Sequence, residues 1–230
     1  MVDSGGERLL GYLLPPRCLL CGRPGQWPCH DLCVACEASL PVLAGGGLCC
    51  EVSIADSHGG APCDRTFAVC AYAPPVDTLI HALKYGGQLA IGRALGRLLA
   101  RGASSFGLQL DVDCLFPVPL HPRRYAERGF NQSAEIARFA ASGLALPVAP
   151  GLAVRRSNTR PQVGLAPGDR HVNLQGAFTA GQAPVRGRRI VIVDDVITTG
   201  STVAELAHAL KLAGAVTVDV WCVARATLDS

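Results

Sequence analysis

The chain has 230 residues, 49% of them hydrophobic and 17% charged, with a formal net charge of +3. Its length suits one large domain or one domain with a small appendage, and its hydrophobic share excludes global disorder. The small net charge gives no bulk signal for nucleic-acid binding, and no apolar run reaches the ~18 residues of a membrane span. Because the first residues also lack the features of a secretory leader, we expect a cytoplasmic protein.

Two CxxC motifs stand near the start of the chain, Cys18-Leu-Leu-Cys21 and Cys33-Val-Ala-Cys36, with eleven residues between them. Two thiolates two residues apart can bind one Zn²⁺ ion, and the second pair completes its tetrahedron. Four thiolates leave no open coordination position, so the pattern predicts a structural zinc rather than a catalytic one. We therefore expect a cysteine-rich, zinc-ribbon-like domain over residues 1–66, where a small core needs a metal for stability.

A second complete zinc site is not expected in this domain. The cysteines that follow the two motifs are Cys49, Cys50 and Cys63, with His58 nearby. They form no further CxxC pair, and the side chains of adjacent cysteines point apart, so they serve one tetrahedral ion poorly.

From Phe67 onward, apolar runs of strand length alternate with segments of helical periodicity. We expect strands at 67–73, 114–119, 147–154, 190–193 and 216–223, and helices at 77–85, 88–101, 131–141 and 203–213. The run at 190–193 is continuously apolar, as in parallel strands buried on both faces, and Thr202 with Glu205 predicts a capping box for the last helix. This alternation predicts an α/β domain over residues 67–230, a parallel sheet flanked by helices, with ligands beyond the carboxyl ends of its strands.

The stretch VIVDDVITTGST at 191–202 places two acids directly before a loop of small hydroxyl residues. The members of this loop are Thr198, Thr199, Gly200, Ser201 and Thr202. Hydroxyl groups and the free N–H groups of a helix N-terminus form a cradle for a phosphate monoester. Asp194 and Asp195 would repel a phosphate, so they must serve hydroxyl groups or a divalent cation of the same ligand, and a sugar phosphate meets both demands. The alternative is a capped helix with two solvated acids; P-loop and GxGxxG motifs are absent from the sequence.

These residues resemble a known family. Residues 190–202 resemble the thirteen-residue phosphoribosyl-pyrophosphate (PRPP) signature of type I phosphoribosyltransferases. The resemblance implies that Asp194 and Asp195 hold the ribose hydroxyls and assist Mg²⁺, while residues 198–202 take the 5′-phosphate. It also implies the fold of that family, a parallel sheet flanked by helices.

Other segments are similar to the ComF family of competence-associated proteins. They are PVPLHPRRYAERGFNQS at 117–133, LIHALKYGG at 79–87 and the spaced residues Gln162, Arg170, Asn173 and Phe178. Members of this family carry an N-terminal zinc ribbon ahead of a phosphoribosyltransferase-like domain. In this chain Val52 and Thr66 stand where two cysteines of the family's second zinc site would be.

Departure of pyrophosphate needs positive charge, which Mg²⁺ supplies together with Lys or Arg side chains. Lys84, one of only two lysines, is a catalytic candidate for this role, although a surface lysine at a helix end is an equal alternative. The candidates for the pyrophosphate loop are Arg123, Arg124 and Arg128. Arg160 and Arg170 lie where the family's base-binding hood and mobile loop would fall.

Two functions of different classes follow from these residues. The first is Mg²⁺-dependent transfer of a phosphoribosyl group from PRPP, or a related sugar phosphate, to an unidentified acceptor. The alternative is a non-catalytic competence factor that binds single-stranded DNA during uptake and uses the PRPP pocket for regulation, and a weaker third is a sugar-phosphate sensor in transcription. Seven arginines and one acid between residues 151 and 189 favour phosphate binding, but only 5% of the residues are aromatic, which leaves few stacking platforms for single strands.

Overall fold

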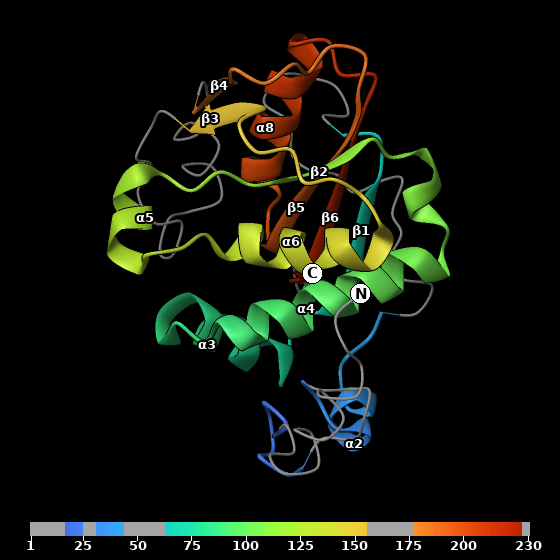
Figure 1. The fold of residues 1–230 in the computed structure, drawn as a ribbon, viewed down its shortest axis with the longest axis vertical. Helices are drawn as coiled ribbons and strands as arrows, with labels where there is room; N and C mark the ends of the chain where they lie inside the picture. The colour runs from blue at the N-terminus through green and yellow to red at the C-terminus, as the bar shows by residue number, and fades with distance from the viewer. Residues whose placement is uncertain (1–16, 25–30, 44–62, 156–176, 227–230) are drawn as a thin grey trace, which may run out of the picture.

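A computed structural model describes residues 17–24, 31–43, 63–155 and 177–226 of the chain (Figure 1). Its helices and strands, in chain order, are α2 (Val34–Ala38), β1 (Thr66–Ala71), α3 (Val76–Gly86), α4 (Leu89–Ser105), the 3-10 turn η2 (Leu108–Asp111), β2 (Cys114–Pro117), α5 (Pro122–Arg128), α6 (Gln132–Leu144), β3 (Ala153–Arg155), β4 (Phe178–Ala180), β5 (Arg189–Ile197), α8 (Ser201–Leu212) and β6 (Thr217–Arg225). None of the described helices is long and apolar enough to cross a membrane.

The four long strands form one parallel sheet in the order β1-β6-β5-β2. Helix α6 packs against β5 and β2, α4 packs against β1 and β6, and α8 covers the opposite face (Figure 1). Helices on both faces bury most of the sheet, which explains why the apolar run of β5 is continuous rather than alternating. The parallel α/β architecture expected from the sequence is confirmed.

Helices α4 and α6 approach each other closely at Gly96. A Cβ atom at this position would lie 2.5 Å from the carbonyl oxygen of Ile136 and 2.7 Å from Cβ of Phe139. Only a glycine permits this spacing of the two helix backbones. The contact matters because the first turn of α6 reaches the carboxyl end of β5.

The prediction of a strand at 147–154 is wrong for most of these residues. Val148 makes only an isolated bridge to Leu115, and β3 pairs with β4 in a separate antiparallel ribbon. Pro147 and Pro150 lack an N–H donor for a ladder, and Gly151 turns the chain with φ of 82°. The ribbon therefore begins only after this turn.

Two local expectations near the predicted loops are also wrong. Thr202 does not cap the last helix, because α8 already begins at Ser201 with Gly200 as its N-cap in the left-handed region, at φ of 77°. The segment after β2 forms helix α5 rather than a loop. Pro122 stands in its first turn and the His121 side chain accepts a hydrogen bond from the Arg123 N–H, so a start signal was present in the sequence.

The cysteine-rich region is attached to the sheet domain through β1 and α4. Residues 41–43 run beside β1, where the Leu43 N–H donates to the Val69 carbonyl at 2.9 Å. Asp31, which is 6% exposed, accepts from the guanidinium of Arg93 at 2.6 Å and from Arg97 at 3.3 Å. The division into domains 1–66 and 67–230 stays a prediction.

Candidate functional site

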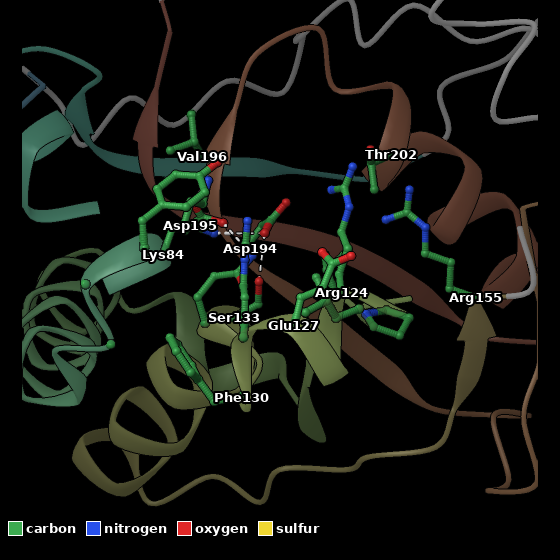
Figure 2. A pocket seen from close by; sticks show the side chains of 18 residues that line it. Lys84, Arg124, Glu127, Phe130, Ser133, Arg155, Asp194, Asp195, Val196 and Thr202 are labelled. Atoms are coloured by element: carbon green, nitrogen blue, oxygen red, sulfur yellow. Dashed lines mark hydrogen bonds and ion pairs between the residues drawn. The ribbon is translucent and has the colours of Figure 1, made fainter. Parts of the chain in front are cut away.

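A cleft of about 770 Å³ opens at the carboxyl ends of β2 and β5, the edge of the sheet where ligands were expected (Figure 2). Its lining comes from the ends of α3, β2, β3 and β5, from the segment with α5, and from the first turns of α6 and α8. The lining residues are Lys84, Tyr85, Gly86, Gly87, Val118, Pro119, Leu120, Arg124, Glu127, Arg128, Phe130, Gln132, Ser133, Arg155, Asp194, Asp195, Val196 and Thr202.

The two acids lie within β5 and are held by side chains of two helices. The Asp195 carboxylate, 3% exposed, accepts from Lys84 Nζ of α3 through Oδ2 and from Gln132 Nε2 of α6 at 3.4 Å through Oδ1. Asp194 Oδ1 accepts from Ser133 Oγ of α6 at 2.8 Å and from the backbone N–H of Asp195 at 2.9 Å. The geometry therefore brings Lys84 to the acid pair, instead of leaving it as a surface lysine.

This arrangement sets the charge of the pair. Burial and the neighbouring charge of Asp195 raise the pKa of Asp194 to about 7, against the effects of the Lys84 ammonium and the Ser133 hydroxyl. Burial opposes the charge of Lys84, but the Asp195 carboxylate raises the pKa of Lys84. The Lys84 ammonium offsets part of the negative charge of the pair, so the three groups together suit hydroxyl groups better than a bare cation.

The other side of the cleft is cationic. Arg124 and Arg155 extend into it beside Thr202, at the first turn of α8 (Figure 2). Burial and the charge of Arg124 lower the pKa of Arg155, and the Arg155 guanidinium lies 5.5 Å from the centre of the Phe178 ring. Two guanidinium groups gathered on one side of a cleft suit a ligand with more than one negative charge.

Arg155 was not among the residues expected at the site. A signal for it existed, because it directly follows the apolar Leu152-Ala-Val stretch and so stands at the carboxyl end of a strand. The sequence predicted a strand of the main sheet at 147–154, so Arg155 was not recognised as the last residue of a strand.

The three arginines expected near the pyrophosphate differ in their positions. Arg124 and Arg128 line the cleft, and Arg128 donates to Gln132 Oε1 at 3.0 Å while lying 5.2 Å from the Tyr85 ring centre. Arg123 is absent from the lining and pairs with Glu127 at 3.4 Å on the surface of α5. Arg160 and Arg170 lie outside the described residues, as do Cys49, Cys50 and His58.

The hydroxyl-rich loop connects β5 to α8 at the same edge. Ser201 is buried, and its Oγ lies 2.9 Å from Thr199 Oγ1; Thr198 is exposed and Thr202 lines the cleft. The first N–H groups of α8, a helix of twelve residues, have no partner within the helix and point out of its N-terminus. The loop therefore offers hydroxyl and N–H donors to an anion.

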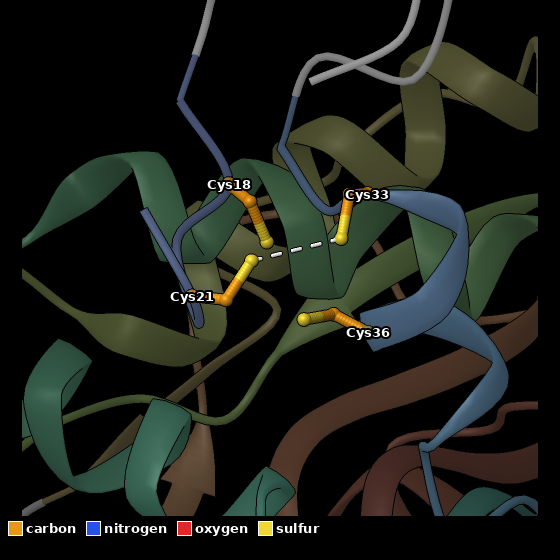
Figure 3. Close-up of side chains that lie close together, drawn as sticks. All are labelled: Cys18, Cys21, Cys33 and Cys36. Atoms are coloured by element: carbon orange, nitrogen blue, oxygen red, sulfur yellow. Dashed lines mark hydrogen bonds between the residues drawn. The ribbon is translucent and has the colours of Figure 1, made fainter. Parts of the chain in front are cut away.

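The four cysteines of the two CxxC motifs come together (Figure 3), and none of them lines the cleft. Their Sγ atoms all lie within 4.8 Å of one another, and those of Cys21 and Cys33 are 3.7 Å apart. Zn–S bonds of about 2.3 Å in a tetrahedron place the sulfur atoms about 3.8 Å apart, so the cluster fits a structural zinc. Burial disfavours the thiolate of Cys18, but N–H groups of the neighbouring backbone lower the pKa of Cys18 to about 6, which favours metal binding.

Comparisons with known proteins find a family model and several relatives that this chain resembles. The family model described as phosphoribosyl transferase domain matches residues 131–227. The DNA utilization protein YhgH of Shigella flexneri is 38% identical over 229 residues, covering 92% of this chain and 98% of that protein. Competence protein F of Haemophilus influenzae is 31% identical over 222 residues, covering 91% of this chain and 97% of its own. A solved glutamine PRPP amidotransferase from B. subtilis is similar over 57% of this chain and 25% of its own, at 23% identity and a TM-score of 0.40.

Proposed function

Because the chain belongs to the ComF family of phosphoribosyltransferase-like competence proteins, we propose that its cleft binds PRPP with Mg²⁺ and transfers the phosphoribosyl group to an acceptor. The observation that carries this proposal is the layout of one cleft. An acid pair that suits hydroxyl groups lies on one side, two arginines lie on the other, and a loop of donors joins β5 to α8.

Each part of PRPP has a matching part of the cleft. Residues 198–202 would hold the 5′-phosphate, and Asp194 and Asp195 the ribose hydroxyls. Arg124 and Arg155 would hold the pyrophosphate and stabilise the negative charge that grows on it as the bond to the ribose breaks. Lys84 would hold Asp195 in place, because the two side chains form an ion pair.

Mg²⁺ is part of this proposal through the pyrophosphate. Asp194 would offer a carboxylate oxygen to such an ion, since Mg²⁺ commonly combines one or two carboxylates with phosphate oxygens of the substrate. When bound, the ion would neutralise charge on the leaving pyrophosphate. The zinc of the four-cysteine cluster would be structural, and its need for reduced thiolates supports a cytoplasmic location for the protein.

The alternative function is a non-catalytic role in the use of DNA. Its support is the names of two relatives, a DNA utilization protein and a competence protein. In this role the cleft would bind PRPP as a regulator and another surface would bind single-stranded DNA. Transfer and regulation share the same cleft, so PRPP binding is the first property to measure.

Calorimetry with PRPP and Mg²⁺ tests the proposal. We expect binding to the wild type and loss of binding by at least about hundredfold when both acids are replaced, in Asp194→Asn with Asp195→Asn. Asp113→Asn is the matched control, because Asp113 precedes β2 at the opposite end of the sheet. Absence of PRPP binding to the wild type would refute both the transferase and the PRPP-regulated alternative. Release of pyrophosphate on addition of an acceptor would then separate the transferase from the regulator.

A further inference from the structure

The four-cysteine cluster is formed by two segments of the chain, which must be held in a fixed relation to each other. Cys18 and Cys21 belong to residues 17–24, and Cys33 and Cys36 belong to residues 31–43. A tetrahedral metal site needs all four sulfur atoms in place at once, so the contacts that join the two segments determine how well the site is preorganised.

Asp31 joins the two segments through its backbone. It lies two residues before Cys33, and its carbonyl oxygen accepts a hydrogen bond at 2.9 Å from the N–H of Leu19, inside the first CxxC motif. The next residue, Leu32, is buried in the same apolar cluster as Cys18 and the apolar side chains of α4. The position of Asp31 therefore sets the position of one motif relative to the other.

The side chain of Asp31 is held by two arginines of helix α4, in the sheet domain. Arg93 donates to Oδ1 at 2.9 and 2.6 Å through two of its nitrogens, and to Oδ2 at 3.2 Å. Arg97 donates to Oδ2 at 3.3 Å. Asp31 is only 6% exposed, and a buried carboxylate keeps its place only while it is paired. The two arginines therefore hold a residue that the metal site needs, from outside the cysteine-rich region.

A third arginine of α4 makes a contact of a different kind. Arg101 pairs at 2.6 Å with Glu37, the residue after Cys36, but the two side chains are 52% and 30% exposed. Exposed ion pairs contribute little, because water screens them and the side chains lose freedom. We therefore expect Arg101 to affect the metal site much less than Arg93 does.

We propose that Arg93 and Arg97 are positioning residues of the metal site, which hold Asp31 and so preorganise the two CxxC motifs. The affinity of the four cysteines for zinc then depends on helix α4 of the sheet domain. The cysteine-rich region is therefore not an autonomous zinc module, although its two CxxC motifs contain all four ligands. Since the proposal involves no residue of the cleft, it is independent of the function proposed for that cleft.

The zinc affinity of the whole chain, measured by competition with a chromophoric chelator, tests this proposal. Arg93→Met should weaken zinc binding by about ten- to one-hundredfold, as is typical for groups that orient metal ligands. Asp31→Asn should weaken it by a similar factor, because the amide keeps the shape of the side chain but not its charge. Arg101→Met should change it by less than about twofold. Arg138→Met is the matched control, since this surface arginine of α6 pairs with Glu135.

Two further comparisons separate positioning from a general effect of charge. In the double variant of Arg93→Met and Asp31→Asn, zinc binding should be within about twofold of the weaker single variant, because the two residues act through one contact. A guanidinium that attracted the thiolates directly would instead give losses that multiply. Arg93→Lys retains the charge and part of the donor capacity, so it should recover part of the affinity that Arg93→Met loses.

Co²⁺ in place of zinc adds a spectroscopic measurement, because its visible absorption differs between a tetrahedral thiolate site and the hydrated ion. Arg93→Met saturated with Co²⁺ should show the wild-type spectrum, since its four ligands are unchanged. If this variant does not fold and gives no such spectrum, Arg97→Met decides the question. It removes one bond to Asp31 and should weaken zinc binding by about three- to tenfold.

Several results would overturn the proposal. Wild-type zinc affinity in a folded Arg93→Met variant, or in Arg97→Met where the first variant does not fold, would show that the site does not need α4. Equal losses in Arg93→Met and Arg101→Met, or losses that multiply in the double variant, would show that the arginines do not act through Asp31. No recovery in Arg93→Lys would have the same meaning.

Discussion

Replacement of Asp194 by Asn should stabilise the folded protein at neutral and alkaline pH while it weakens ligand binding. The folded state holds a proton on this carboxyl up to a pKa of about 7, whereas an unfolded Asp loses it near 3.9. Because the folded-state pKa is raised, the protonated form contributes stability that is fully present below about pH 4 and is lost as pH rises through about 7. An Asn side chain cannot ionise, so the variant should not lose stability over this range.

The magnitude follows from the difference between the two pKa values. Three units at about 1.36 kcal/mol each give an upper limit of about 4 kcal/mol, and water in the cleft reduces this, so we expect about 1–3 kcal/mol. Asn retains the hydrogen bonds of the folded state, because its Oδ1 can accept from Ser133 Oγ and the Asp195 N–H as Asp194 does. The gain is therefore not offset by a lost contact.

Urea unfolding followed by the fluorescence of the buried Trp221 measures this effect at about pH 5 and about pH 8. The stability difference between Asp194→Asn and wild type should grow with pH. Asp113→Asn is a control of opposite sign, since hydrogen bonds from Arg189 lower the pKa of Asp113 and its ionised form stabilises the fold above the unfolded pKa. Parallel pH profiles for Asp194→Asn and wild type would refute the reasoning.

Three further variants or treatments test other parts of the structure. Gly96→Ala should lower the free energy of unfolding by about 1–3 kcal/mol in urea, because its Cβ meets the Ile136 carbonyl. Gly86→Ala should not, because its Cβ would lie 3.6 Å from the side-chain end of Gln88, an ordinary contact. Arg155→Met should weaken PRPP binding by about tenfold or more in calorimetry but affect ribose 5-phosphate less, and equal effects would contradict its place at the pyrophosphate. Removal of zinc by a chelator should lower the thermal midpoint by about 5–10 °C, with no change in a Cys33→Ser variant that already lacks the site.

The sequence was most informative where one local pattern carries both structure and chemistry. The apolar run of β5 and the hydroxyl loop after it indicated a buried parallel strand, a ligand edge and a phosphate cradle, and the structure has the strand and the edge. The two CxxC motifs likewise indicated a four-cysteine cluster, because ligands so close in sequence need little tertiary information to meet.

Contacts between residues that are distant in the chain could not be predicted from local patterns. Nothing in the sequence joins Lys84 to Asp195, since their contact depends on where the end of α3 lies above the carboxyl edge of β5. Arg155 was hidden for a similar reason, because its strand pairs with β4 in a small ribbon and not with the main sheet. Both side chains change the electrostatics of the cleft, so its charge could be understood only from the fold.

Helix α4 shows how one regular pattern can serve two interfaces. Its periodicity predicted a helix at 88–101 from the apolar positions alone. The structure adds that Arg93, Arg97 and Arg101, spaced by four residues, all pair with acids of the cysteine-rich region. Gly92 and Gly96 lie against α6, whose first turn holds both acids of the cleft. The arginine spacing fixes the cysteine-rich region on one side of α4, and the glycine spacing fixes α6 on the other. The position of the acid pair therefore depends on a helix whose polar face is itself an interface.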